Sequence, residues 1–183
     1  MGLPCVQPGK RVRNKTNQTK SQILAAGFEC FLKYGYTKST FGDIANFAGL
    51  SRASIYLYFR NKEDLFITMN KNLQDKYVAK SEEILESNRT DKEKLNAIID
   101  VWITSHYKKI KNTVFANDLL DGLLHVSEQT ELRFRALFIK SISPLVGKDK
   151  AEIVVMSMRG LMDDRPPVTK LQKRIKLLAS AML

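Results

Sequence analysis

The segment spanning residues 40–65, TFGDIANFAGLSRASIYLYFRNKEDL, constrains the fold of this 183-residue chain more than any other part of it. Two short helical patterns meet there at Gly49 and Leu50. Gly49 tolerates the positive φ angle that a tight turn between helices requires, because it has no Cβ. Ala45 is small enough for the second helix to cross the first, and a further helix is expected to begin at Asn61. The segment therefore predicts a helix-turn-helix.

Capping residues mark the helix ends around this turn. Thr40 and Asp43 have the spacing of a capping box, in which each side chain accepts a hydrogen bond from the other residue's backbone N–H. Ser51 is placed to cap the second helix of the pair. The preceding helix, predicted over about residues 20–34 by its apolar spacing, should end at Gly35.

Helical spacing of apolar residues continues through the remaining chain. Further helices are predicted from Asn61 toward residue 80, from Thr90 past Trp102, over about 112–125 and 129–142, over about 149–163, and after Pro167 to the end. No segment has the alternation typical of a strand, so the expected fold class is all-α. We expect a flexible basic arm over residues 1–18, a helix-turn-helix domain over 19–66 and a C-terminal helical domain over 67–183.

The charge of the chain favours a polyanionic partner. It has 30 Lys and Arg against 19 Asp and Glu, a formal net charge of +11. Residues 1–65 hold 10 of these cations against 4 anions, whereas residues 66–183 hold 20 against 15. Nucleic acid and an anionic membrane surface both fit this surplus, and so does a soluble protein that is basic for colloidal reasons.

Other function classes have weaker support. Two cysteines do not make a disulfide framework, which suits a reducing cytoplasm, and the chain has neither an apolar run of about 20 residues nor a secretory signal at its start. An enzyme would have to use the scattered His106, Asp118, Asp121 and His125, which match no metal or nucleophile motif. A membrane-surface role would rest on the basic, amphipathic residues 170–183 but would leave residues 40–65 unexplained.

The wider pattern resembles the signature of the TetR/AcrR family of transcriptional regulators. The residues that carry the resemblance are Thr40, Ile44-Ala45, Ala48-Gly49-Leu50-Ser51, Ile55-Tyr56, Tyr58-Phe59 and Lys62-Glu63-Asp64-Leu65, preceded by Phe31, Gly35 and Tyr36. The resemblance covers about residues 20–66. It implies an N-terminal three-helix DNA-binding domain and a C-terminal helical domain that binds an effector and dimerises.

The resemblance also implies which residues contact DNA. These are Thr40, Ser51, Arg52, Ser54, Tyr56, Tyr58 and Lys62. Arg52 can present two donors to a guanine edge and so read sequence, whereas the hydroxyl groups and Lys62 are expected to position the protein on phosphates. The chain departs from the family at Ala53, where many members have glycine, and this weakens any transfer of operator preference.

Two further sets of residues follow from the resemblance. The expected lining of an effector pocket comprises Trp102, His106, Tyr107, Phe115, Leu119, Leu123, Phe134 and Phe138. The expected dimer interface, on the last two helices, comprises Val154, Ser157, Gly160, Leu161, Leu171, Ile175, Leu178 and Met182. For both sets the alternative is ordinary core packing within one subunit.

The sequence thus predicts a cytoplasmic, sequence-specific DNA-binding regulator that has no catalytic residues, no metal site and no cofactor. Its expected partners are a double-stranded operator, a second copy of itself and a small apolar or amphipathic effector, with no membrane. The favoured form is a repressor that binds a palindromic operator as a dimer and is released by its ligand. The alternatives are a ligand-independent DNA-binding regulator and a transcriptional activator of the same fold.

Overall fold

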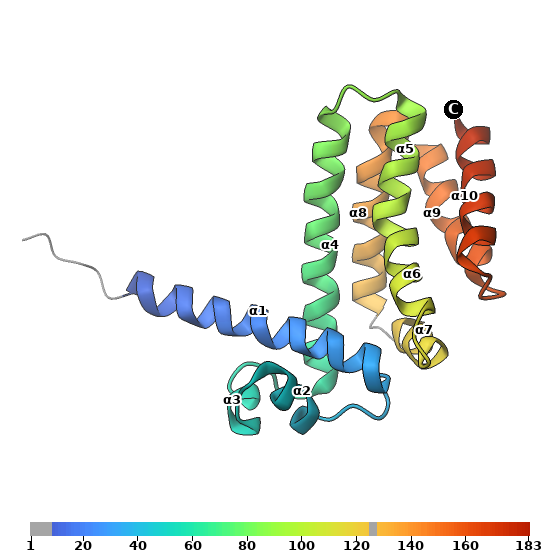
Figure 1. Ribbon diagram of the computed structural model, residues 1–183. Coiled ribbons are helices and arrows are strands. Elements are labelled where there is room, and N and C mark those ends of the chain that lie inside the picture. The colour runs from blue at the N-terminus through green and yellow to red at the C-terminus, as the bar shows by residue number, and fades with distance from the viewer. Residues whose placement is uncertain (1–8, 125–127) are drawn as a thin grey trace, which may run out of the picture. The chain divides into compact units, whose positions relative to one another are not determined.

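The computed structural model of the protein describes residues 9–124 and 128–183, and every regular element within them is a helix (Figure 1). This confirms the all-α fold class. The chain divides into two compact units, one reaching to Met69 and the other beginning at Asn70, close to the boundary expected after residue 66. None of the described helices is both long and apolar enough to cross a membrane.

The N-terminal unit contains α1 (Gly9–Tyr34), α2 (Phe41–Ala48), α3 (Arg52–Tyr56) and the first turns of α4 (Lys62–Glu86). The helix α1 begins about ten residues earlier than its apolar spacing indicates. The flexible arm predicted for residues 1–18 is therefore wrong from Gly9 onward, where the chain is already helical. The expected arm's first eight residues lie outside the described part of the chain.

A small apolar core holds the N-terminal unit together. Ile23 of α1, Ile44 of α2, Ile55 of α3 and Leu65 of α4 are completely buried. Each helix thus contributes a side chain to one cluster, and burial of each contributes about 1.5–3 kcal/mol. Close packing is visible at Gly27, where an added Cβ would lie 2.8 Å from a methyl carbon of Leu65. This core sets the crossing of α2 and α3.

The predicted caps are confirmed. Thr40 and Asp43 form the capping box of α2, and the Ser51 side chain accepts a hydrogen bond from the Ser54 N–H at the start of α3. Gly35 and Gly49 have φ angles of 81° and 63°, in the left-handed region that favours glycine. Local rules of helix initiation and termination therefore account for the turn between α2 and α3.

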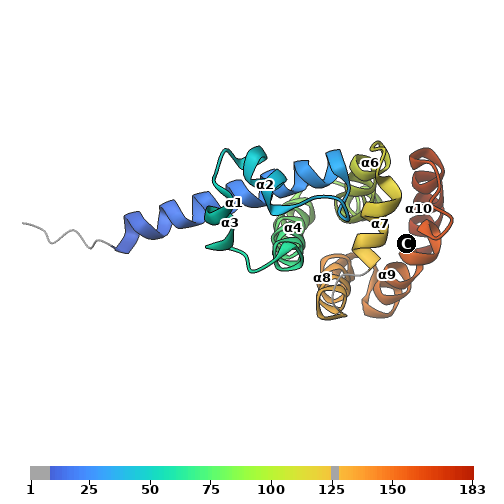
Figure 2. The same cartoon turned by 90° about the horizontal axis from the view of Figure 1, so that it is seen from below.

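The C-terminal unit is built from the rest of α4, α5 (Asp91–Ile99), η1 (Asp100–Thr104), α6 (Ser105–Lys111), α7 (Ala116–Leu124), α8 (Glu128–Val146), α9 (Lys148–Met162) and α10 (Val168–Met182). Seen nearly end-on, α8 and α9 lie side by side, and α10 lies next to α9 (Figure 2). The predicted capping box of Thr90 and Glu93 begins α5.

A π-helical turn, η1, joins α5 to α6, where the apolar spacing predicts one continuous helix. The Ser105 N–H bonds to the Asp100 carbonyl five residues earlier, and the Ser105 hydroxyl donates to the Asp100 carboxylate at 2.9 Å. Trp102 lies in this turn, buried to 2% exposure, and its indole N–H donates to the Ser81 hydroxyl at 2.9 Å. The π-turn thus places the indole in the core of the unit.

Candidate DNA interface

The outward surface of α3 carries the polar residues expected to touch DNA. Ser51 and Arg52 are exposed, Tyr56 is half exposed, and Ser54 is partly buried beside Ser51. The hydroxyl groups of Ser51 and Ser54 are hydrogen-bonded to each other at 2.8 Å. Arg52 donates to the Tyr56 hydroxyl at 3.3 Å, with its guanidinium 5.8 Å from the ring centre. The structure therefore brings four of the predicted residues together on one short helix.

Two residues that sequence reasoning missed hold α2 and α3 in place. The Phe41 ring of α2, nearly buried, packs edge-on against the Tyr56 ring with centroids 5.0 Å apart. Gln22 of α1 donates its side-chain N–H to the Ala48 carbonyl at the end of α2, over 2.7 Å. The apolar position of Phe41 was visible in the sequence, but nothing local points from Gln22 to a carbonyl 26 residues away.

Thr40 is held by its own capping box. The Asp43 carboxylate accepts from the Thr40 N–H at 2.9 Å and from its hydroxyl at 2.6 Å, and the Asp43 N–H donates back to that hydroxyl at 3.2 Å. The side-chain hydrogen bond from Thr40 is the main reason why the pKa of Asp43 lies below its ordinary value. A phosphate that accepted a hydrogen bond from the Thr40 hydroxyl would have to compete with this carboxylate.

The Lys62 ammonium is bound to backbone carbonyls. It donates to the Tyr36 oxygen at 2.6 Å and to the Thr37 and Ser39 oxygens at 3.0 Å each, and it lies 4.6 Å from the Tyr36 ring centre. We call this arrangement the lysine clamp. An ammonium has three N–H donors, so three carbonyls satisfy it. The phosphate contact expected of Lys62 stays a prediction, and the clamp gives this lysine a second role in shaping the loop before Thr40.

Tyr58 follows α3 in the turn toward α4. Its side chain is partly buried, and its backbone N–H donates to the Ile55 carbonyl at 3.0 Å. Arg60, two residues on, is well exposed and pairs with Asp64 in the first turn of α4. The expected DNA contact of Tyr58 stays a prediction.

Most residues expected to line an effector pocket belong to the packed core. Trp102 stacks on Phe138 with ring centroids 5.0 Å apart, and Phe134 packs edge-on against both. Leu119 is also buried and Phe115 is partly buried, whereas the side chain of Leu123 lies outside the described residues. The three rings therefore pack against one another in the core of the C-terminal unit.

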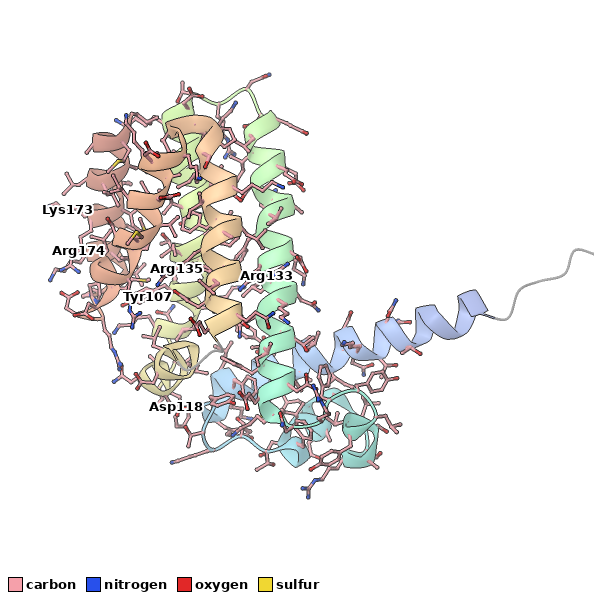
Figure 3. All side chains as sticks on the ribbon, turned by 180° about the vertical axis from the view of Figure 1, so that it is seen from behind. Tyr107, Asp118, Arg133, Arg135, Lys173 and Arg174 are labelled. Atoms are coloured by element: carbon pink, nitrogen blue, oxygen red, sulfur yellow. The ribbon has the colours of Figure 1, made fainter. Side chains whose placement is uncertain are left out.

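Two polar members of the expected pocket, Tyr107 and His106, differ in what surrounds them. The Tyr107 hydroxyl donates to the Pro166 carbonyl at 2.7 Å, in the loop between α9 and α10 (Figure 3). Burial, and to a smaller extent Lys109, lowers the pKa of His106 to about 4, so its imidazole is neutral at pH 7. These two groups therefore add hydrogen-bonding capacity but no charge to the core.

The two acidic residues that an enzyme would need, Asp118 and Asp121, both lie on α7. Asp121 pairs with Arg165, and within residues 9–124 and 128–183 no group of three His, Cys, Asp or Glu side chains is placed to hold a metal. His125 lies outside the described residues. The enzyme alternative thus gains nothing from the described part of the chain.

Part of the expected dimer set lies inside the unit and not on the outer faces of α9 and α10. Val154, Leu171 and Ile175 are at most 4% exposed and pack inside the unit, so the prediction that they form an interface with another subunit is wrong. Leu161, Leu178 and Met182 pack against the same core and Ser157 is partly buried, whereas Gly160 is exposed. The apolar residues that do face outward on these helices are Ile153, Met156 and Leu177.

These features define a helix-turn-helix domain joined to an all-helical second domain, which is the architecture of a class of bacterial transcription regulators. The family model described as bacterial regulatory proteins, tetR family, matches residues 23–69. The chain is 38% identical over 78 residues to a fatty acid metabolism regulator protein of Bacillus subtilis, covering 43% of this chain and 40% of that one. It is 33% identical over 66 residues to the regulator TtgR of Pseudomonas putida, covering 36% of this chain and 31% of that one.

Solved structures extend the likeness to the C-terminal unit. A TetR transcription regulator from Haloarcula marismortui matches with a TM-score of 0.67 at 21% identity, covering 91% of this chain and 99% of that one. A transcriptional regulator from Cytophaga hutchinsonii matches with a TM-score of 0.71 at 19% identity, covering 88% and 95%. The match to the tetR family model is thus confined to residues 23–69, and the solved structures show a shared fold over most of the rest of the chain. The chain's alignments with the sequence relatives span less than half of their length.

Proposed function

We propose that the protein is a sequence-specific DNA-binding regulator of transcription that acts as a repressor in the cytoplasm. The observation that carries this proposal is the outward surface of α3, where Ser51, Arg52 and Tyr56 are exposed beside the Gly49 turn. Arg52 supplies a bidentate donor for a guanine edge, and the hydroxyl groups supply phosphate contacts. The surplus of Lys and Arg in residues 1–65 supports attraction to DNA.

We infer that two copies bind a palindromic operator. One short reading helix covers only a few base pairs, and helix-turn-helix regulators gain affinity from two half-sites about 34–36 Å apart. In the described residues, α9 and α10 leave Ile153, Met156 and Leu177 from 52% to 67% exposed. These side chains, with Gly160 permitting close approach, support a dimer through the outer faces of both helices.

We infer that the regulator is released by a small apolar or amphipathic effector bound in the C-terminal unit. A relative named as a regulator of fatty acid metabolism supports an apolar ligand. The ligand can release DNA only if it binds one state of the protein better than another, and α4, which belongs to both units, is the natural link. The close packing of Trp102, Phe134 and Phe138 favours the second candidate, a regulator that needs no ligand.

Selection of bound sites from random duplex DNA with the full-length protein tests the DNA-binding proposal. We expect an inverted repeat whose half-sites are about one helical turn apart or a multiple of it. Enrichment of no sequence over the input pool would refute sequence-specific binding. A single unrepeated site would refute the palindromic dimer but leave DNA reading in place.

Sedimentation of the free protein tests the dimer separately. We expect a dimer at micromolar concentration and a monomer for Leu177→Glu, because this substitution places a charge in the inferred interface. Leu132→Glu is the matched control, since Leu132 is a similarly exposed leucine (56%, against 65% for Leu177) on α8, outside that surface. A dimer that persists in Leu177→Glu would exclude this face of α10.

A further inference from the structure

The outward face of α3 consists of two different stripes. The helical backbone continues one residue past α3, because Leu57 has φ −68° and ψ −22°. Residues four apart on a helix lie on the same face. Arg52 and Tyr56 therefore form one stripe, and Ala53 and Leu57 form a second stripe beside it, while Ile55 points into the core.

The first stripe is polar and already ordered. Arg52 donates to the Tyr56 hydroxyl at 3.3 Å, and the Tyr56 ring is packed against Phe41. The guanidinium is thus held along the helix by a tyrosine whose own position is determined by α2. This arrangement reduces the rotamer entropy that Arg52 would lose on binding a base edge.

The second stripe is apolar and has no contact that would explain it within the described chain. Ala53 is exposed, and Leu57 is 83% exposed. A single exposed leucine is common on protein surfaces and by itself does not indicate a binding site. Leu57 differs because it lies one turn beyond an exposed alanine and next to the stripe that is placed to read bases. Its neighbours along this surface carry hydroxyls and a guanidinium, so the apolar patch is small and sharply bounded.

We propose that Ala53 and Leu57 read thymine by packing against its 5-methyl group, next to the base pair that Arg52 contacts. This inference rests on the proposed function and specifies how the same surface chooses its operator. Thymine is the only base that presents a methyl group in the major groove, and small apolar side chains are its usual partners. The two stripes together would favour half-sites in which a guanine lies beside one or more thymines.

The test uses the best site obtained by selection with the full-length wild-type protein. Each thymine of one half-site is replaced in turn by deoxyuridine, which removes the methyl group and keeps the O4 acceptor. We expect at least one replacement to weaken binding by about four-fold, the ratio that corresponds to burying one methyl group. For Leu57→Ala, the penalty of the same replacement should fall below about two-fold, because the partner of the methyl group is gone.

Leu132→Ala is the matched control, since it truncates another exposed leucine (56%) on α8, outside both α3 and the inferred dimer surface, and should keep the full deoxyuridine penalty. Because Leu57 is almost fully exposed, Leu57→Ala should unfold at the wild-type temperature. If no deoxyuridine weakens binding, or if the penalty is equal in wild type and Leu57→Ala, the inference is refuted while the proposed function stands. A uniform loss of affinity for thymine and uracil sites alike would instead assign Leu57 to the sugar-phosphate backbone. Failure to select any site would refute both proposals.

Discussion

Replacing Lys62 by methionine separates the two roles of this lysine. The substitution keeps an unbranched side chain of similar length and removes the ammonium that donates to the carbonyls of Tyr36, Thr37 and Ser39. A hydrogen bond from a charged donor contributes about 1.5–3 kcal/mol when its partners cannot turn to water. Here the side chain is only partly buried and the Thr37 contact is exposed. Water therefore replaces much of the lysine clamp, and we expect a loss of about 2 kcal/mol in the free energy of unfolding.

Thermal unfolding followed by circular dichroism measures this loss. For a chain of 150–250 residues, 1 kcal/mol shifts Tm by about 2–4 °C, so Lys62→Met should unfold about 4–8 °C below wild type. Lys76→Met is the control, because Lys76 is an exposed lysine on the same helix α4 and its replacement should leave Tm within about 1 °C.

The salt dependence of DNA binding distinguishes the lysine clamp from a phosphate contact. Each lost phosphate contact lowers the slope of log K against log salt by about 0.9. If the ammonium stays on its three carbonyls in the complex, Lys62→Met should bind more weakly, because the loop before Thr40 is displaced, but with the wild-type slope. A variant with wild-type Tm and a slope of log K against log salt shallower by about 0.9 per site would show that Lys62 contacts phosphate. That result would refute the structural role assigned to the lysine clamp.

Three further predictions concern the turn, the cap and the loop between α9 and α10. Gly49→Ala should destabilise the protein by about 1–2 kcal/mol in urea unfolding. The cost comes from backbone strain at φ +63°, because no atom lies within 4 Å of the added Cβ. An unchanged urea midpoint would show that the turn relaxes to another φ. Asp43→Asn should be less stable than wild type at pH 7, and this difference in the free energy of unfolding should shrink as the pH falls. A carboxylate whose pKa is lowered on folding stabilises the protein above its unfolded pKa and loses that effect as the pH drops through the folded pKa. A difference that stays constant from pH 7 to about pH 2 would contradict this prediction. Tyr107→Phe should cost about 1–2 kcal/mol, because it leaves the buried Pro166 carbonyl without its donor, and a stability equal to wild type would mean that water replaces the hydroxyl.

Local sequence rules predicted the N-terminal unit well because its boundaries depend on neighbouring residues. The capping box of Thr40 and Asp43, the Ser51 cap and the positive φ of Gly49 all follow from spacings of a few residues. The lysine clamp could not be predicted in this way. It joins Lys62 to carbonyls more than 20 residues earlier, and no side-chain pattern marks a carbonyl as an acceptor.

The C-terminal unit shows a different limit. Apolar spacing identified α9 and α10, but it does not say whether an apolar face meets its own subunit or another one. The spacing predicts Val154 and Ile175 at the interface although they close the core, and it does not single out Met156 and Leu177, which are exposed. Similarly, aromatic residues at helical spacing fit a ligand pocket and a packed cluster equally well, and Trp102 belongs to the cluster.

The π-turn at Asp100–Thr104 bears on how this chain should be aligned with its relatives. A π-turn of this kind is equivalent to one residue inserted into a continuous α-helix. The extra residue is absorbed locally, so the helix faces before and after it stay in register. A relative without the turn would be shorter by one residue within a helix, where alignments normally place no gap. An alignment that moved this gap into the loop after α6 would shift the comparison of every α6 residue, Tyr107 included, by one position.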